Sequence, residues 1–235
     1  MCSTIPTRNV LVVAVQVSQH NCVDCGQAPH TAQASNSSAS WMTQSICEFC
    51  GIPQPLRSDE DYFSIFAVPV RFAQDRTLIE KRFYELSRLL HPDRFVQKSR
   101  NAQIRSNERM GFLNQAYSTL KDPRRLRDYV LGRERIQAQK QVPMEIVEAW
   151  FEIQEGIQDG ISRSATWIEQ FKAFETSLAA FQKSVEQTLL ALESAYDHQP
   201  SQSILEELAQ SVQTQSYLNS LEKDVERIKK NAHSN

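Results

Sequence analysis

A long helical repeat of apolar residues constrains the fold of this chain more than any other feature. Over residues 167–196, large apolar side chains recur every three or four positions, which is the spacing of an α-helix that buries one face. Residues 208–228 repeat the pattern after a polar turn at 198–201, and residues 143–157 carry a shorter version before it. The pattern predicts a three-helix, coiled-coil-like bundle at residues 141–235.

Glycine is scarce: only 6 of the 235 residues are glycine, well below the usual share of about 7%. No GxGxxG or GxxxxGK[ST] pattern occurs, so the phosphate-binding loops of nucleotide-binding α/β enzymes are missing. The sequence therefore favours a mainly α fold. No nucleophile and base stand out together, and we expect a protein that is not an enzyme.

No apolar segment reaches the 18 to 20 residues or so that a membrane span requires. The most apolar stretch, residues 10–17, is too short and contains a glutamine. The segment before it has a single basic residue, unlike an Arg-rich mitochondrial presequence. We expect a strand or an unstructured lead-in there, and a cytoplasmic protein, with the mitochondrial matrix as the alternative.

Charge is distributed unevenly along the chain, although the formal net charge is only −2. Residues 57–135 contain 17 basic and 11 acidic side chains, whereas residues 136–235 contain 8 and 15. A basic segment followed by an acidic one favours two surfaces for two different partners. Neither charge is large enough to require nucleic acid.

The basic segment has the pattern of a helical hairpin. Asp75 is the expected N-cap of a helix that runs to about Leu90, and a second helix is expected at about residues 105–120. Each carries one apolar stripe at steps of three and four, consisting of Ile79, Phe83, Leu86 and Leu90 in the first and Met110, Leu113, Tyr117 and Leu120 in the second.

Two shorter helices are expected beside the hairpin. One covers residues 59–67 and ends before Pro69, because the residue before a proline is biased away from helical backbone. The other opens at Pro123 and runs to Leu131, where Gly132 is a C-terminal stop. Residues 57–135 are thus predicted to form one domain, with two antiparallel helices joined by an exposed loop.

Residues 1–56 contain all five cysteines, four of them in two CxxCG motifs separated by 21 residues. Each motif can present two thiolates to one ion from a tight turn, and the glycine permits the positive φ that such a turn needs. Four thiolates leave tetrahedral zinc no open position, so we predict one structural zinc ion in a zinc-ribbon-like region. The expected ligands are Cys22, Cys25, Cys47 and Cys50.

Two alternatives to zinc remain open for these cysteines. A redox CxxC normally begins a helix in a βαβ pattern, which is missing here. Two disulfides would imply an oxidising compartment, which nothing in the sequence indicates. Cys2, His20 and His30 are expected to be bystanders.

The tripeptide His91-Pro92-Asp93 lies where the first helix of the hairpin is predicted to end. In this context it resembles the J-domain, a module that stimulates ATP hydrolysis by DnaK-type chaperones. The resemblance also includes KRFYELSRLLHPDRF at residues 81–95 and LNQAYSTLKDP at residues 113–123. It covers roughly residues 59–132 and implies an antiparallel helical hairpin with an HPD loop.

The J-domain resemblance implies that the HPD loop docks on a chaperone. An ionised Asp93 can pair with an arginine of the partner, while His91 can donate a hydrogen bond. Pro92 limits the entropy lost on docking, and basic side chains steer the domain toward an acidic surface. The basic residues assigned to this surface are Lys81, Arg82, Arg88 and Arg94.

A J-domain followed by an acidic three-helix domain resembles the HscB family, the J-type co-chaperones of iron–sulfur cluster assembly. The resemblance spans about residues 59–235. In that family the first helix of the second domain presents apolar and acidic side chains to the scaffold protein IscU, in a pattern like L-M-E-x-x-E. Residues 143–148 (PMEIVE) occupy that place, although Pro143 and Phe151 depart from the pattern. The implied scaffold-binding residues are Met144, Val147, Glu148, Phe151, Glu155 and Tyr217.

The same helix has two apolar stripes by periodicity alone. The stripe expected to face the bundle contains Ile146, Trp150, Ile153 and Ile157. The second stripe contains Met144, Val147 and Phe151, and residues 144–160 hold five acidic side chains and no basic one. An apolar stripe bordered by charge of one sign is typical of a partner-binding face. A wide core stripe is the alternative.

The sequence thus predicts a co-chaperone that delivers IscU to a specialised, HscA-like DnaK-type chaperone and stimulates its ATPase. A general J-protein for unfolded clients is the main alternative. A zinc-ribbon nucleic-acid binder would need bases in the ribbon, where only Arg8 is present. A thiol redox enzyme would need to lose its activity when zinc is loaded. No nucleic-acid or membrane partner is expected, and the oligomeric state, including a homodimer, is left open.

Overall fold

The structure is a computed structural model that describes the following parts of the chain: residues 21–27, 40–42, 44–136, 143–161 and 164–233. The segment 10–17 and the bystander residues Cys2, His20 and His30 lie outside the described residues. The described part consists of helices, turns and one isolated antiparallel bridge between Ile46 and Pro53. The predicted mainly α fold is therefore confirmed.

Two compact units make up the chain, Met1–Tyr129 and Val130–Asn235. The first unit contains both the cysteine motifs and the helical hairpin, and the second contains the predicted bundle. The domain limits expected at 56/57 and at 135/141 stay a prediction. In the described ranges, no helix is long and apolar enough to cross a membrane.

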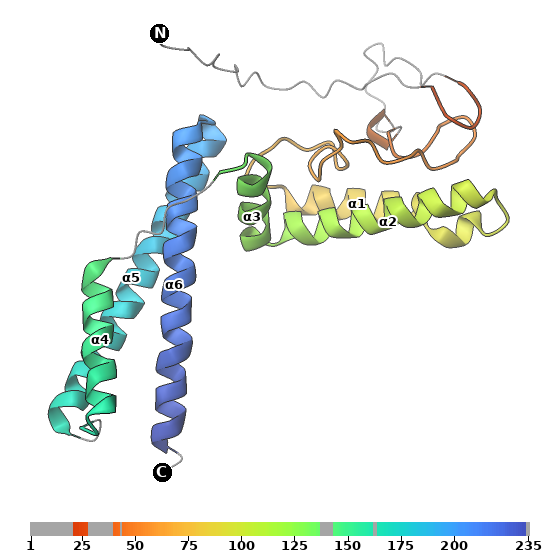
Figure 1. Ribbon diagram of the computed structural model, residues 1–235. Helices are drawn as coiled ribbons and strands as arrows, with labels where there is room; N and C mark the ends of the chain where they lie inside the picture. Colours follow the sequence, from red (N-terminus) through yellow and green to blue (C-terminus); the bar gives the residue numbers. More distant parts are fainter. Residues whose placement is uncertain (1–20, 28–39, 43, 137–142, 162–163, 234–235) are drawn as a thin grey trace, which may run out of the picture. The chain divides into compact units, whose positions relative to one another are not determined.

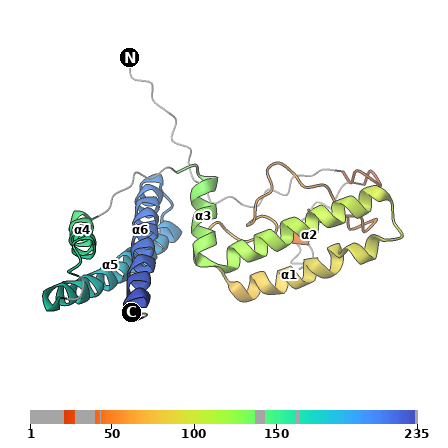
Figure 2. The ribbon, with the colours of Figure 1, turned by 60° about the horizontal axis from the view of Figure 1, so that its bottom comes forward.

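The hairpin of the first unit consists of α1 (Arg76–Leu90) and α2 (Arg100–Lys121), which lie side by side (Figures 1 and 2). The predicted N-cap is confirmed, since Asp75 Oδ1 accepts a hydrogen bond from the Leu78 backbone N–H at 3.0 Å. Helix α2 begins earlier than expected because Ser99 caps it, accepting from the Ala102 N–H at 3.3 Å. A serine cap satisfies a backbone donor that would otherwise lack a partner.

The buried face of α1 agrees with the predicted stripe, whereas that of α2 is rotated. Met110 and Tyr117 are only partly buried, and Arg109 is fully buried beside them. Several buried side chains on this face of α2 are small. At the edge of the buried face, the Tyr117 ring stacks on the Phe83 ring of α1, with ring centroids 4.2 Å apart. The buried residues of α2 are Ala102, Ser106, Arg109, Leu113, Ala116 and Leu120.

Both flanking helices differ from their predictions. Residues 59–67 form turns rather than a helix, because Asp61 Oδ1 accepts the N–H groups of Phe63 and Ser64 at 3.1 and 2.7 Å. Such side-chain bonds compete with helical ones. Helix α3 (Pro123–Arg133) opens where expected but continues through Gly132; this glycine sits in helical backbone, and Arg135 takes the positive φ instead.

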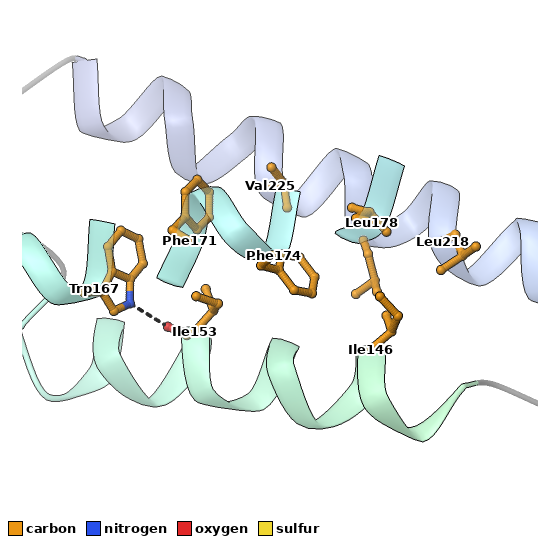
Figure 3. Close-up of a cluster of buried hydrophobic side chains, with 9 residues drawn as sticks. Ile146, Ile153, Trp167, Phe171, Phe174, Leu178, Leu218 and Val225 are labelled. Carbon is orange, nitrogen blue, oxygen red and sulfur yellow. Dashed lines mark hydrogen bonds between the residues drawn. The ribbon is translucent and has the colours of Figure 1, made fainter. Parts of the chain in front are cut away.

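The second unit is a three-helix bundle of α4 (Met144–Gln158), α5 (Ala165–His198) and α6 (Gln202–His233). Figure 3 shows side chains of all three helices converging on one apolar core. This core confirms the predicted bundle and its inward stripe on α4. Its buried members are Ile146, Ile153, Trp167, Phe171, Phe174, Leu178, Leu218, Leu221 and Val225.

The contact between α4 and α5 depends on a glycine. The Trp167 indole lies against the α4 backbone, and its Nε1–H donates to the Ile153 carbonyl at 3.2 Å (Figure 3). A Cβ added at Gly156 would lie 2.3 Å from Trp167 Cδ1. Buried Gly156 therefore gives the indole room to reach the helix.

The substitution Gly156→Ala is expected to destabilise the bundle by about 1 to 3 kcal/mol, because the Trp167 ring must leave its position. Gly111→Ala is the matched control: it is also a helical glycine, but a Cβ there meets no atom within 4 Å. The control should be neutral or raise the stability of its own unit by up to about 1 kcal/mol. Denaturant unfolding followed by tryptophan fluorescence measures both, and an equal effect of the two variants would contradict the packing argument.

Candidate functional site

The two CxxCG motifs form matching turns. The Gly26 N–H donates to the Cys22 carbonyl at 2.8 Å, and the Gly51 N–H donates to the Cys47 carbonyl at 2.9 Å. Both glycines have positive φ, 71° and 65°, as the sequence predicts. Because residues with a Cβ rarely adopt a positive φ, glycine is what allows each pair of thiols to point the same way.

The four thiols converge on one point. The distance between sulfurs is 3.6 Å for Cys22 and Cys50 and 3.8 Å for Cys25 and Cys47, and all four lie within 4.8 Å of one another. Zinc–sulfur bonds of about 2.3 Å in a tetrahedron place sulfurs about 3.8 Å apart. The four predicted ligands are thus positioned to bind a metal ion, whereas a disulfide would need about 2.05 Å.

The thiols of this cluster differ in acidity when no metal is bound. Burial works to raise the pKa of Cys22, but backbone N–H groups of Cys25 and Asp24 and the Gln54 amide outweigh it and lower that pKa to about 6. Burial, with the neighbouring thiols, raises the pKa of Cys50 to about 12. One thiolate is therefore ready at neutral pH, and other ligands must release protons when a metal binds.

Helix α2 holds the second cysteine motif through the buried Arg109. Its Nε donates to the Gln54 carbonyl at 2.7 Å, and Nη2 donates to the carbonyls of Gln44 and Pro55 at 3.0 and 2.8 Å. Nη1 donates to Ser45 Oγ and pairs with the Glu60 carboxylate, whose side chain is only 2% exposed. Burial lowers the pKa of Arg109, against the attraction of Glu60.

The HPD loop is exposed and fixed at both ends. The side chains of His91 and Asp93 are 53% and 86% exposed, and Pro92 opens the short helix η2 (Pro92–Phe95). Phe95 is buried directly after it. Before the loop, Ser106 Oγ on α2 donates to the Leu90 carbonyl at 2.6 Å. The tripeptide therefore projects from the end of α1 instead of packing inside the unit.

The four basic residues predicted for the docking surface differ in exposure. Lys81, Arg88 and Arg94 are exposed. Arg82 is partly buried: its guanidinium donates to the carbonyls of Phe66 and Ala67 and lies 5.0 Å from the ring centre of Trp41. The structure shows Arg82 bonded within its own unit. Its role at a docking surface stays a prediction.

The predicted scaffold-binding residues fall into two groups. On α4, Met144 and Phe151 are 67% and 63% exposed, Val147 is partly buried, and the two acids Glu148 and Glu155 are exposed. Tyr217 lies on α6 and packs against the bundle core. The α4 residues thus form an apolar face bordered by acidic side chains, whereas the role of the partly buried Tyr217 in scaffold binding stays a prediction.

The comparisons with known proteins agree with this arrangement. The DnaJ domain model matches residues 61–129. The Co-chaperone protein HscB homolog of Vibrio cholerae is 30% identical over 128 residues, which is 52% of this chain and 74% of the relative. The chain belongs to the HscB family of co-chaperones. The homologue of Aliivibrio salmonicida is 27% identical over 173 residues, covering 72% of this chain and 96% of the relative.

Among solved structures, human co-chaperone HscB aligns with a TM-score of 0.59 at 24% identity, covering 89% of this chain and 98% of that one. This likeness supports the fold. The predicted family and the J-domain are therefore confirmed, and residues 61–129 can be called the J-domain of this HscB-family chain.

Three residues that support the site were not predicted from the sequence: Arg109, Glu60 and Gln54. A signal for Arg109 was present, because Ala102, Ser106 and Leu113 mark a second possible stripe on α2 that includes position 109. A basic residue in a stripe is usually assigned to the surface. Gln54 had no signal, since its contact with Cys22 depends on the folded path of residues 44–55.

Lowering the pH is expected to weaken zinc binding steeply. The bound ion needs four thiolates, yet the pKa of Cys50 is about 12 in the metal-free protein, so binding displaces protons. Below about pH 6, Cys22 must also lose a proton. The apparent affinity should fall about tenfold per pH unit for each displaced proton. Competition with a coloured chelator measures this, and an affinity that does not depend on pH would contradict a thiolate site.

Proposed function

We propose that this HscB-family chain delivers the iron–sulfur scaffold protein IscU to a specialised, HscA-like DnaK-type chaperone. In this proposal the HPD loop stimulates the chaperone's ATPase, while α4 binds the scaffold. The observation that carries the proposal is that one chain holds two exposed, differently charged surfaces: a rigid loop beside a basic helix and an apolar stripe bordered by acids. The chain acts as an adaptor and performs no chemistry itself.

The HPD loop supports chaperone docking through its exposure and its anchoring. The His91 ring Nδ1 accepts from the Asp93 N–H at 3.4 Å, and both side chains stay exposed. A loop already held by Pro92 and buried Phe95 loses little conformational entropy when it docks. The exposed Asp93 carboxylate is then available for a charge-assisted bond to an arginine of the chaperone.

The outer face of α4 supports scaffold binding. Ile146 and Ile153 already cover the bundle core, so Met144 and Phe151 on the other face remain exposed. Large exposed apolar side chains on one face of a helix are typical of an interface rather than of ordinary surface. Acidic neighbours at its border favour a partner with basic residues around an apolar centre.

The four-cysteine cluster is proposed to hold one structural zinc ion. Its four sulfurs have the spacing of a closed tetrahedral site, which leaves no position for substrate or water. When bound, zinc supplies a crosslink between the two turns. For localisation we propose the cytoplasm, with the mitochondrial matrix as the alternative.

A general J-protein that delivers unfolded clients is the second candidate function. The J-domain, which both functions share, favours neither. The exposed stripe on α4 distinguishes them, because a general client-binding surface need not bind one folded scaffold with a defined stoichiometry. Binding of IscU therefore decides between the two.

Replacing His91 with glutamine is expected to lower stimulation of the chaperone ATPase at least tenfold or so, since one charge-assisted contact contributes about 1.5 to 3 kcal/mol. The steady-state ATPase rate of an HscA-type chaperone, with and without IscU, measures this. His198→Gln is the matched control, because His198 is also exposed but lies at the end of α5. Full stimulation by the His91 variant would refute the docking role of the loop.

Alanine at Met144 or Phe151 is expected to weaken IscU binding by about tenfold or more each, as for central interface residues. Leu190→Ala is the control, since Leu190 is an exposed apolar residue of the same bundle, 56% exposed on α5. Titration calorimetry with full-length protein measures the dissociation constants. If IscU binds equally to all variants, α4 is not the scaffold-binding face, and a general J-protein becomes the better reading.

A further inference from the structure

Gln54 connects the cysteine cluster to the J-domain. Its side-chain amide Nε2 donates to Cys22 Sγ at 3.3 Å and to the Ile52 carbonyl at 3.1 Å. Its own backbone carbonyl accepts from Arg109 Nε at 2.7 Å. One residue therefore contacts both a metal-binding sulfur and the buried centre of α2.

Arg109 joins this residue to the hairpin rigidly. The guanidinium is fully buried and donates to three backbone carbonyls, a serine hydroxyl and the Glu60 carboxylate. A buried cation that loses such acceptors keeps its desolvation cost without compensation. Residues 44–55, which include the second cysteine motif, are thus held in a fixed position on α2.

The first cysteine motif is attached to the same helix one turn away. Asp24, between Cys22 and Cys25, forms an ion pair with Arg105, four residues before Arg109. The Asp24 N–H also points at Cys22 Sγ, at 3.4 Å. Both turns that would surround a metal ion are therefore bonded to neighbouring positions of α2.

The same turn of α2 holds the end of α1. Ser106 is fully buried, and its hydroxyl donates to the Leu90 carbonyl, next to His91. The bonds to the cysteine turns and the bond to the end of α1 thus all start from one stretch of five residues on α2, Arg105–Arg109. Packed elements joined by buried polar bonds transmit changes in stability between them.

We propose that metal binding at the four cysteines is coupled to the stability of the J-domain hairpin, with Gln54 as the positioning residue for Cys22 and with Arg105 and Arg109 as the links to α2. The inference rests on the zinc site of the proposed function. A metal that holds the two turns together lowers the frequency with which they detach from α2, and α2 in turn strengthens metal binding. By thermodynamic linkage the two effects are equal in size.

The first experiment tests the positioning role of Gln54 in the full chain. Gln54→Met keeps the length of the side chain but removes the N–H donor, and it leaves the backbone bond to Arg109 in place. Second-sphere bonds of this kind usually change metal affinity about 10- to 100-fold. Gln74→Met is the matched control, because the Gln74 amide donates to the carbonyls of Pro69 and Arg71, away from the cysteines. Zinc competition measures the affinity, and the thiolate charge-transfer band of the cobalt(II) form reports the lost hydrogen bond.

The second experiment measures the coupling by hydrogen exchange. In the wild-type chain, zinc loading should slow exchange of α2 amides around Ser106 and Arg109 by about tenfold or more compared with chelator-treated protein, while α5 and α6 stay unchanged. Arg105→Gln should reduce this protection and the zinc affinity by the same factor. The double variant Arg109→Met with Glu60→Gln removes the buried link to α2 and leaves no unpaired buried charge. If this double variant does not fold, Arg105→Gln still tests the coupling.

The outcomes separate the coupling from the zinc site itself. A chain that binds no zinc or cobalt at any pH overturns the proposed site, and the coupling with it. Tight zinc binding with unchanged exchange in α2 overturns only the coupling. Equal zinc affinities and cobalt spectra for Gln54→Met and Gln74→Met overturn the positioning role of Gln54.

Discussion

A buried guanidinium organises the first unit of this chain. Arg109 has no access to water, so its N–H groups must find protein acceptors, and they find them in residues 44–60. A cation buried without such acceptors would cost several kcal/mol. The arrangement explains why the cysteine segment belongs to the same compact unit as the hairpin. The J-domain and the candidate metal centre are therefore joined by one polar network.

The second unit is stabilised in a different way. Its core is apolar throughout, and the hydrogen bond from Trp167 to the Ile153 carbonyl is the one polar contact drawn within it (Figure 3). Because an α-helix has 3.6 residues per turn, residues two positions apart lie on different faces. Helix α4 can therefore bury Ile146 and Ile153 and still expose Met144 and Phe151. The helix is thus held by one face and exposes apolar side chains on the other. This division of faces leaves an exposed apolar stripe on the second unit, while the first unit exposes the HPD loop.

Much of the fold and site was predictable because the signals are local. The cap at Asp75, the four cysteines and the long periodic stripes each depend on residues close in sequence, and the structure agrees with all three. The errors have physical causes. Asp61 forms side-chain bonds to nearby N–H groups and stops a helix at residues 59–67, and Gly132 remains helical because glycine permits a stop without requiring one.

Periodicity predicted the long helices, and motif spacing predicted that four cysteines lie together, since both depend on neighbouring residues. The family was suggested by a resemblance in short motifs and is shown by similarity to known co-chaperones. The folded chain alone decided which face of α2 is buried and that Gln54 lies against Cys22. Both depend on contacts between segments more than 30 residues apart, and a linear pattern carries no record of such distances. A buried arginine looks the same in sequence as one on the surface; only its surrounding acceptors, brought together by folding, distinguish the two.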